Sequence, residues 1–593
     1  MPLLIRRNRV ATVLAALVTA AAALTAGCSP GAPDPGSSPS PAETRAPSPT
    51  PTVQTPVVTP TQTATPTVEP TATATPATEP PTATPAETAT PTPRPAGRGG
   101  VLKTAVETAG QHFDIHREVS PAISAWGIGL IYNRLFRYTD EREGPLVECE
   151  LCESWEMPDI ETLRVTMRQD VYWHDKPPLD GRRVTAHDVV FSYNRQKQDS
   201  MPNRDLLRNV EFAALDDRTI EFTVSRPDSD LLLNLADGRS RIVAREAVAE
   251  NGNLEEGPNV GTGPWVWDST TRGHSVSRYK RNDDYFEPGL PYLDGLEVHA
   301  IPENRSRRTA FQVGVMDATD ATAAQTEETL EKKPDTRVRT VLYPGAGAEV
   351  AINASTHVLS DIRVRKAVFS MMDPWGDQDT IWGGDGRVTL GMPIPRDSWL
   401  LLDEQMRGDF NNPERARRLV QEADITPGTE IEITVGRYGD DYLELAEDLA
   451  EKLRSLGFIV PVEEVTRNAF VSDYWRKGGY QILIGPQAPV DGLNDDLFSV
   501  YHSQGQWNTT GYHTDELDRL IERQAVEMEP SKRRDQLREI QTLTLEGAHR
   551  ITVAARLGYW LSQPYVHGFE PNIRRGDNHF LANVWIDEDA RED

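Results

Sequence analysis

The alternation of hydrophobic and polar residues between positions 430 and 485 predicts an α/β unit. The segment IEITV (431–435) has the period of a half-buried strand, and FIVPVEEV (458–465) and YQILIG (480–485) are expected to form two further strands. A shorter helix is expected before the third strand. A longer one is expected between the first two, where apolar residues recur at helical spacing: Leu443, Ala446, Leu449, Leu453 and Leu456. This order of elements implies right-handed crossovers and a parallel sheet.

Similar patterns predict elements nearer the N-terminus. Residues 163–167 alternate like a half-buried strand, and residues 101–106 are expected to form a strand that precedes a helix from 123 to 135. Thr185 followed by Asp188 is a capping-box pattern, so a helix should begin there.

Two helical patterns follow in the C-terminal half. Residues 361–372 place apolar side chains on one helical face, which is interpreted as core rather than as a cofactor site. Residues 515–547 are expected to form two amphipathic helices that are broken near Pro530.

The first 27 residues have the features of an export signal. Three arginines precede an apolar run from Val10 to Leu24 that is too short to span a bilayer. The run ends at LTAGC, which resembles a lipobox, so we expect Cys28 to be diacylated and to become the first mature residue. An ordinary secretory signal with an incidental cysteine is the alternative.

Residues 28–98 are predicted to be a disordered tether behind this lipid anchor. The segment from Ser29 to Arg98 contains 19 prolines and 18 threonines and no aromatic residue, so it cannot bury apolar surface. At about 3.1 Å per residue where it is extended, it would reach up to roughly 200 Å from the anchor.

Charge and cysteine content exclude some functions for the remaining chain. The net charge of the whole chain, −28, argues against nucleic acid or anionic lipid surfaces as partners. Cys149 and Cys152 form a C-x-x-C pair in an exported protein. A redox site and a zinc half-site are alternative interpretations, but no thioredoxin pattern and no second ligand pair accompany the motif. A local disulfide or two free thiols is favoured.

Several sequence blocks occur in an order that resembles a known family. They are GGVLKTAVETAGQHFDIHREVSP, IYNRLFRYTD, the segment CESWEMPDIETLRVTMRQDVYWHDKPPLDGRRVTAHDVVFSYNR from Cys152, the segment VGTGPWVWDSTTRGHSVSRYKRNDDYFEPGLPYLDGLEVHAIP and the helix DIRVRKAVFSMM. Together they resemble the family 5 extracellular solute-binding proteins, the peptide, oligopeptide and nickel receptors of bacterial ABC importers.

The resemblance implies the fold and the domain boundaries. It implies a two-lobed α/β fold like that of the periplasmic binding proteins (type II, large peptide-binding cluster), with mixed sheets flanked by helices. Lobe I would comprise residues 99–348, completed by 556–593, and lobe II would comprise residues 349–555.

The resemblance also implies a function. We expect a monomeric, lipid-anchored receptor outside the cytoplasm that captures short peptides by lobe closure and delivers them to an ABC permease with its ATPase subunits. An oligosaccharide or a nickel chelate is the alternative ligand, and a lipid-tethered signalling or structural protein is the alternative class. No catalytic or nucleotide-binding motif is present, so neither an enzyme nor a cofactor is expected.

Two charged residues follow predicted strands of the parallel unit. Arg437 comes after strand 431–435, and Asp491 comes after strand 480–484. Since ligands sit beyond the carboxyl ends of parallel strands, these residues could hold the carboxylate and the ammonium of a short peptide. In peptide-binding relatives an aspartate after this strand takes the amino terminus. Asp495 and Asp496 are further acidic candidates, and solvated loop charges are the alternative.

Aromatic residues are candidates for stacking on a peptide side chain or a sugar, with partly buried core as the alternative. They are Trp126, Trp375, Trp382 and Trp507, the last beside Asn508. A metal at His112 and His116 is disfavoured, because the segment is expected to be an irregular loop with solvated side chains, and no metal site is predicted.

Overall fold

The computed structural model describes residues 97–592 apart from 109, 111, 140–144, 271–274, 489–491 and 572–575. The predicted signal, Cys28, most of the predicted tether and Asp491 therefore lie outside the described residues. In the described part of the chain, no helix is both long enough and apolar enough to cross a membrane.

The largest sheet among the described residues has eleven strands. Ten of them lie in the order β15 (Val462–Val465), β14 (Ile433–Gly436), β16 (Ile482–Pro486), β12 (Arg337–Ile352), β17 (Arg550–Ser562), β11 (Ala318–Ala321), β1 (Val101–Val106), β10 (Gly295–Ala300), β9 (Val276–Arg281) and β8 (Trp265–Thr270); β13 (Arg387–Thr389) pairs with β17. A second sheet has the order β4 (Cys152–Asp159), β5 (Thr162–Met167), β7 (Thr219–Val224), β6 (Val210–Ala214).

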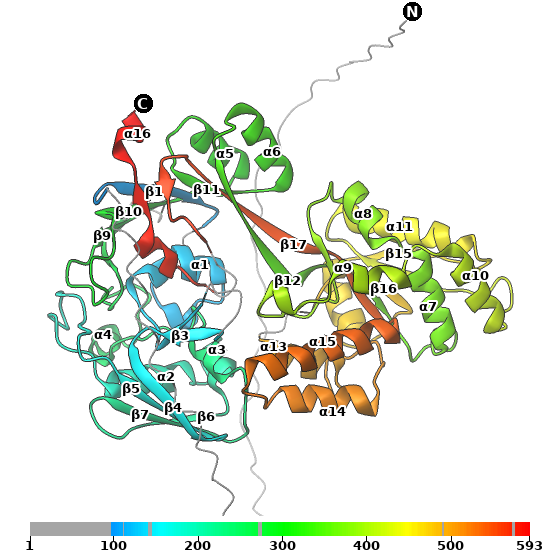
Figure 1. Ribbon diagram of the computed structural model, residues 1–593, viewed down its shortest axis with the longest axis horizontal. Coiled ribbons are helices and arrows are strands. Elements are labelled where there is room, and N and C mark those ends of the chain that lie inside the picture. Colours follow the sequence, from blue (N-terminus) through cyan, green and yellow to red (C-terminus); the bar gives the residue numbers. More distant parts are fainter. Residues whose placement is uncertain are drawn as a thin grey trace, which may run out of the picture. The chain divides into compact units, whose positions relative to one another are not determined.

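The helices form two groups along the chain, one before strand β12 and one after it (Figure 1). The first group is α1 (Pro121–Trp126), α2 (Ala186–Gln196), α3 (Leu231–Leu235), α4 (Arg245–Asn251), α5 (Asn304–Gln312) and α6 (Ala323–Lys332). The second group is α7 (Ile362–Met371), α8 (Pro374–Ile381), α9 (Asp403–Met406), α10 (Pro413–Glu422), α11 (Asp440–Arg454), α12 (Arg467–Ala469), α13 (Leu493–Asp496), α14 (Asp515–Gln524) and α15 (Pro530–Gly547); the short helix α16 (Glu588–Glu592) follows near the C-terminus.

Most elements predicted from the hydrophobic pattern are present. Strand β14 pairs in parallel with β15 and with β16, which confirms the parallel unit. Helix α2 begins with the predicted capping box between Thr185 and Asp188. Pro530 is the first residue of α15, so the break between the last two helices is confirmed.

The predicted helix from 123 to 135 is wrong. Helix α1 ends at Trp126, and a short 3-10 turn, Ile128–Ile131, follows Gly127. At Gly129 a side chain would lie 1.8 Å from the carbonyl oxygen of Ser124, so this close approach requires glycine. The backbone then becomes extended at Tyr132 and directs the next residues into a buried polar network.

Two hydrophobic cores define two lobes. The first core draws its residues from 102–341 and 560–586, and we call this part lobe I. The second part, lobe II, contains three clusters drawn from residues 342–555. Each lobe therefore buries apolar surface of its own, which is the dominant favourable contribution to folding.

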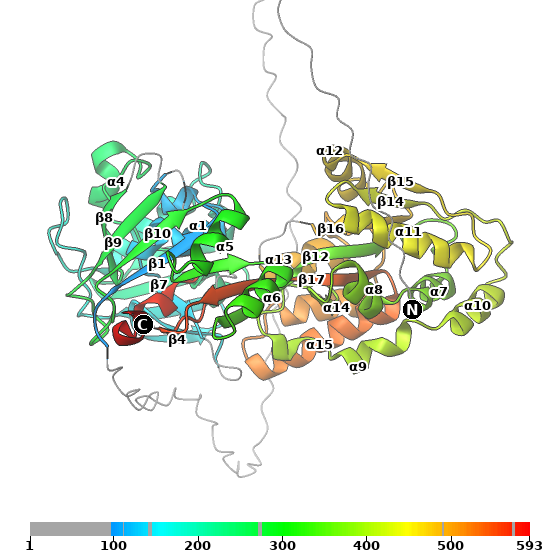
Figure 2. The ribbon, with the colours of Figure 1, turned by 90° about the horizontal axis from the view of Figure 1, so that it is seen from above.

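Strands β12 and β17 pair along both lobes (Figure 2). Residues 337–343 pair with 556–562 on the lobe I side, and residues 347–351 pair with 550–555 on the lobe II side. The register shifts between Tyr343 and Gly347, where the backbone φ of Gly347 is 155°. A β-carbon there would lie 2.2 Å from the carbonyl oxygen of Ala554, so glycine is required at this irregularity.

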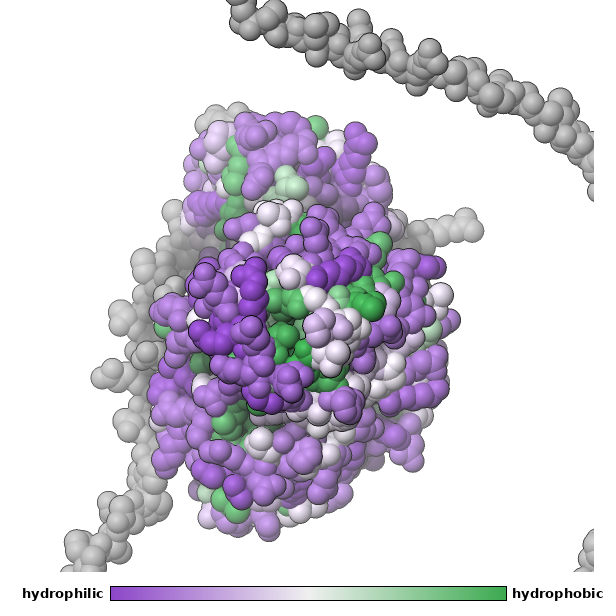
Figure 3. All heavy atoms as spheres, turned by 90° about the vertical axis from the view of Figure 1, so that its right-hand side faces the viewer, coloured by the Kyte–Doolittle hydropathy of each residue, from purple (hydrophilic) through white to green (hydrophobic). Residues whose placement is uncertain are grey.

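The outer side of lobe II carries an exposed apolar region. Hydrophobic residues gather near the middle of the face on which α7, α10 and α11 lie in Figure 1, and hydrophilic residues surround them (Figure 3). A hollow of about 390 Å³ lies at the C-terminal ends of α10 and α11 and is lined in part by Val420, Ile425, Leu456 and Phe458.

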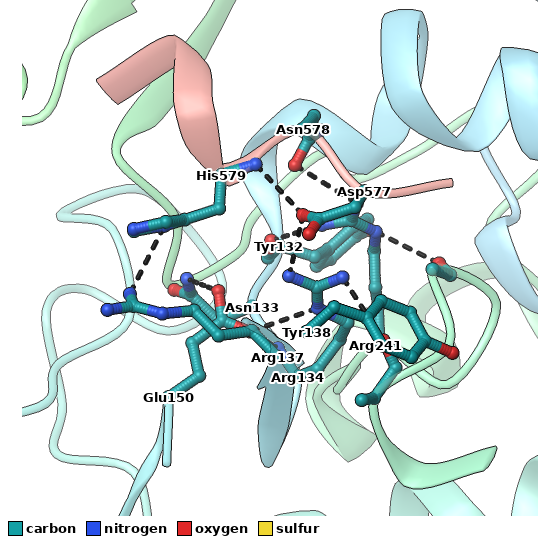
Figure 4. Close-up of polar contacts among 12 residues, drawn as sticks. Tyr132, Asn133, Arg134, Arg137, Tyr138, Glu150, Arg241, Asp577, Asn578 and His579 are labelled. Atoms are coloured by element: carbon teal, nitrogen blue, oxygen red, sulfur yellow. Dashed lines mark hydrogen bonds and ion pairs between the residues drawn. The ribbon is translucent and has the colours of Figure 1, made fainter. Parts of the chain in front are cut away.

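A buried polar network joins the beginning and the end of lobe I (Figure 4). The guanidinium of Arg134 donates to Glu150 and to Asp577, each at 3.0 Å, and the Arg134 side chain is fully buried. Burial alone would lower the pKa of Arg134, but the carboxylates of Asp577 and Glu150 raise it. Arg241 donates to the carbonyl oxygens of Tyr132 (2.8 Å) and Gly576 (2.9 Å). These contacts attach residues 576–579 to the N-terminal part of the lobe.

Replacing Arg134 by methionine should lower the free energy of unfolding by about 3–5 kcal/mol, because it removes the guanidinium with which both buried carboxylates form ion pairs. Urea unfolding followed by circular dichroism measures the change. The matched control is Arg164→Met, whose exposed ion pair with Glu221 should contribute less than about 1 kcal/mol. Equal losses in the two variants would contradict this role for Arg134.

Candidate functional site

A cavity of about 470 Å³ lies where the two lobes meet. Its lobe I wall is formed by residues around the 3-10 turn Arg204–Leu207 and by the segment that leads into α3. Its lobe II wall comes from α13, the π-helical segment Leu497–Tyr501, residues 506–507 and α14. The lining residues are Asp205, Leu206, Arg208, Asn209, Arg226, Pro227, Asp228, Asp230, Asn234, Gly492, Asn494, Asp495, Phe498, Gln506, Trp507, Ile521, Glu522 and Ala525.

Local packing fixes the position of both walls of the cavity. In lobe I, Leu231, Leu233 and Leu235 of α3 are buried in the core, which fixes the acidic segment that precedes them at the surface of the lobe. In lobe II, Leu517 and Ile521 of α14 are buried, and the hydroxyl of Thr514 caps the helix by accepting from the amide of Leu517.

The lining carries acidic, basic and aromatic groups. Burial raises the pKa of Asp228, and the nearby charge of Asp230 adds to the increase. The guanidinium of Arg226 lies 6.0 Å from the ring centroid of Phe498. A polar ligand with charged ends and an apolar body would find complementary groups on both walls.

Trp507 is the predicted aromatic residue that lines this cavity. Its ring meets that of Trp475 edge-on, with 6.4 Å between centroids, and the guanidinium of Arg476 lies 5.8 Å from its centroid. The neighbouring Asn508 does not line the cavity. Its amide nitrogen donates to the carbonyl oxygens of His502 (3.1 Å) and Tyr512 (2.9 Å), which stabilises the loop that carries Trp507.

The other three predicted tryptophans pack inside the lobes. Trp126 is 1% exposed and stacks on Trp560 in lobe I, with 4.9 Å between centroids. In lobe II the indole nitrogen of Trp375 donates to Asp403, and that of Trp382 donates to Asp441, both at 2.8 Å. These rings pack against the hydrophobic core of their own lobe and do not line the cavity.

Of the predicted charged residues, Arg437, Asp495 and Asp496 lie among the described residues. Arg437 forms an ion pair with Glu464 of the neighbouring strand β15 at 3.0 Å and does not line the cavity. Asp491 lies outside the described residues, although the next residue, Gly492, lines the cavity. Asp495 also lines it, whereas Asp496 is buried and its pKa is raised well above the ordinary value by burial.

The cysteine pair and the histidine segment serve the fold of lobe I. Cys149 and Cys152 are joined in a disulfide between β3 (Val147–Cys149) and β4.

The expectation of solvated side chains near His116 is wrong, because His116 is fully buried and its imidazole lies 2.9 Å from the guanidinium of Arg195. Burial and this positive charge lower the pKa of His116 to about 4. Within the described ranges no group of three or more His, Cys, Asp or Glu residues could hold a metal ion.

The sequence patterns did not single out the acidic segment Asp228–Asp230 or its partner Arg533. A signal for the arginine exists. Arg533, Leu537 and Ile540 have helical spacing and are all buried, so a charged residue stands within an apolar stripe. Such a residue needs a buried partner, and the partner lies about 300 positions away in the chain.

Replacing Trp375 by alanine should lower the free energy of unfolding by about 3–5 kcal/mol, because it removes a buried ring from the core of lobe II. Trp507→Ala is the matched comparison and should cost about 1 kcal/mol, since the ring is only half-buried. Urea unfolding measures both. A larger loss for Trp507 than for Trp375 would place Trp507 in the folding core rather than at a site.

Comparisons with known proteins agree with this architecture. The family model described as "Bacterial extracellular solute-binding proteins, family 5 Middle" matches residues 147–509. The chain is 26% identical over 432 residues to the probable D,D-dipeptide-binding periplasmic protein DdpA of Escherichia coli K12, covering 70% of this chain and 81% of that protein. It is 24% identical over 477 residues to di/tripeptide-binding protein 1 of Pseudomonas aeruginosa UCBPP-PA14, covering 74% and 86%.

Solved structures show the same fold. The structure of HbpA2 from Haemophilus parasuis superimposes with a TM-score of 0.73 at 22% sequence identity, covering 82% of this chain and all of that one. The predicted two-lobed α/β architecture is therefore confirmed.

Proposed function

Because the chain belongs to the family 5 bacterial extracellular solute-binding proteins, we propose that it captures short peptides between its lobes and delivers them to an ABC permease. The ATPase partner of the permease would supply the energy for transport. The proposal depends on one observation above all. A cavity large enough for a small ligand lies where two separately packed lobes meet, and both lobes contribute polar lining residues.

The paired strands supply a hinge for such a receptor. The ladder between β12 and β17 is irregular around residues 344–346, between the part in lobe I and the part in lobe II. Backbone rotation there would separate the walls of the cavity without disturbing either core. We therefore propose lobe boundaries near 348/349 and 555/556, next to this irregularity.

A peptide is the preferred ligand. The relatives named above are dipeptide- and di/tripeptide-binding proteins, and the cavity offers carboxylates, two guanidinium groups and two aromatic rings. An oligosaccharide is the second candidate, because Trp507 and Phe498 provide surfaces on which a sugar ring could stack. A nickel chelate is the third. We further propose that the receptor is a monomer that Cys28 anchors to the membrane through a lipid.

A thermal-shift screen of the protein tests the ligand class. Short peptides should raise the melting temperature, since a ligand that binds only the folded state stabilises it by mass action. Cello- and xylo-oligosaccharides and nickel chelates are the comparison sets. A shift with one of these sets alone would replace the peptide, and no shift with any set would favour a signalling or structural protein.

Two substitutions test the contacts of a peptide found in this screen. Asp491→Ala should weaken its binding more than about tenfold if this carboxylate takes the ammonium group. Arg437→Ala is the control, and we expect less than about a twofold change because the structure pairs Arg437 with Glu464. Isothermal titration calorimetry measures both, and an unchanged affinity for Asp491→Ala would remove this residue from the site.

A further inference from the structure

A polar cluster connects the two lobes beside the cavity. We call it the interlobe cluster; it consists of Asp228, Ser229 and Asp230 from lobe I and of Asn494, Gln524, Ala525 and Arg533 from lobe II. These residues lie before α3 on one side and in or next to α13, α14 and α15 on the other.

Arg533 is the centre of this cluster. One of its terminal nitrogens lies 2.5 Å from a carboxylate oxygen of Asp230, and each side chain is 3% exposed. Its other terminal nitrogen donates to the carbonyl oxygen of Ser229 at 3.1 Å. The remaining nitrogen, Nε, donates to the side chain of Gln524 at 3.3 Å, so the whole guanidinium is engaged.

Further hydrogen bonds cross between the lobes around this pair. The backbone amide of Asn494 donates to Asp230 at 2.8 Å, and its side-chain amide donates to Asp228 at 2.6 Å. The amide of Ser229 donates to the carbonyl oxygen of Ala525 at 2.7 Å, and its hydroxyl donates to that of Gln524 at 3.0 Å. The lobes are thus joined by directional polar contacts.

The partners are positioned independently of one another. Asp230 immediately precedes the buried leucines of α3 in lobe I, and Arg533 shares a helix with the buried Leu537 and Ile540 of lobe II. Each lobe can therefore present its half of the cluster without the other. If the lobes separate, the carboxylate and the guanidinium return to water, so the buried pair exists only when the lobes meet.

We propose that the ion pair between Arg533 and Asp230 holds the lobes together in the absence of ligand, with Arg533 as a positioning residue. The inference rests on the proposed function only in that the lobes open and close. Asp228, Asp230 and Asn494 belong to the cluster and also line the cavity, so the wall of the cavity is complete only while the cluster is formed. A ligand enters or leaves after this contact opens, and the contact therefore limits exchange.

The distance between the lobes in the ligand-free protein tests the proposal. Spin labels are attached at Ile160 of lobe I and Ile459 of lobe II, which are 60% and 55% exposed. A non-cysteine label is used because Cys149 and Cys152 form a disulfide. Double electron–electron resonance then gives the populations of short and long distances.

Removing one partner should open the molecule. Wild type should show mainly the short distance, and Arg533→Gln or Asp230→Asn should reduce the ratio of closed to open molecules at least about tenfold, because a buried charge loses its counter-charge. Arg533→Lys keeps the charge but not the planar fork, so it should restore part of the closed population. The double variant should be no more open than either single one, as expected for one shared interaction.

A matched control separates this effect from general destabilisation. Within lobe I, the buried Arg307 of α5 forms an ion pair at 2.8 Å with Asp320, whose side chain is 33% exposed, so Arg307→Gln removes an ion pair without crossing between lobes. Its distance distribution should equal that of wild type. Asp230→Asn replaces one carboxylate oxygen by an amide nitrogen and keeps the size of the side chain. This variant tests the proposal if Arg533→Gln does not fold.

Two results would overturn the proposal. One is a ligand-free wild type without the short distance, and the other is a set of Arg533 and Asp230 variants that keep the wild-type distribution. Neither result depends on which ligand binds. Failure of the thermal-shift screen would count against peptide capture and leave this measurement intact.

Discussion

The antiparallel pairing of β12 and β17 is the constraint on which the rest of this structure depends. The two strands share a ladder that lies partly in lobe I and partly in lobe II, so the hydrogen bonds of one sheet pass from one core to the other. Each lobe adds its own strands to the sides of this pair. The separation into two cores follows, because helices and loops pack against the nearest part of the sheet.

The irregularity near Gly347 gives this ladder a point at which it can bend. Three residues of β12 pass without partners in β17, and the backbone at Gly347 adopts a conformation that side chains disfavour. The contacts between the lobes beside the cavity are correspondingly polar. Charged and hydrogen-bonding groups return to water at a modest free-energy cost, whereas a large apolar interface would hold the lobes together permanently.

Buried charges have two different roles in this molecule. Inside lobe I, Arg134 with Glu150 and Asp577 attaches the returning C-terminal segment to the N-terminal part, and all three side chains are buried within one lobe. Between the lobes, Arg533 and Asp230 are equally buried but belong to separately folded units. The same chemistry therefore serves permanent attachment in one place and reversible contact in the other.

The local pattern of the sequence by itself determined much of the fold. The parallel strands around β14, the capped helix α2 and the break at Pro530 depend on periodicity and on helix signals that act over a few residues. The ordered family blocks determined the two-lobed architecture. A helix from 123 to 135 was wrongly predicted because the burial of Arg134 depends on Asp577, which lies far along the chain.

The site was decided by the tertiary structure. Four tryptophans are equally plausible from sequence, yet only Trp507 lines the cavity, because the cores of the lobes bury Trp126 and Trp375 and Asp441 engages Trp382. Arg437 stands at a strand end as predicted, but the neighbouring strand supplies its counter-charge. The pairing of Arg533 with Asp230 joins residues 303 positions apart. No short-range pattern encodes such a contact, since it exists only when two separately folded lobes come together.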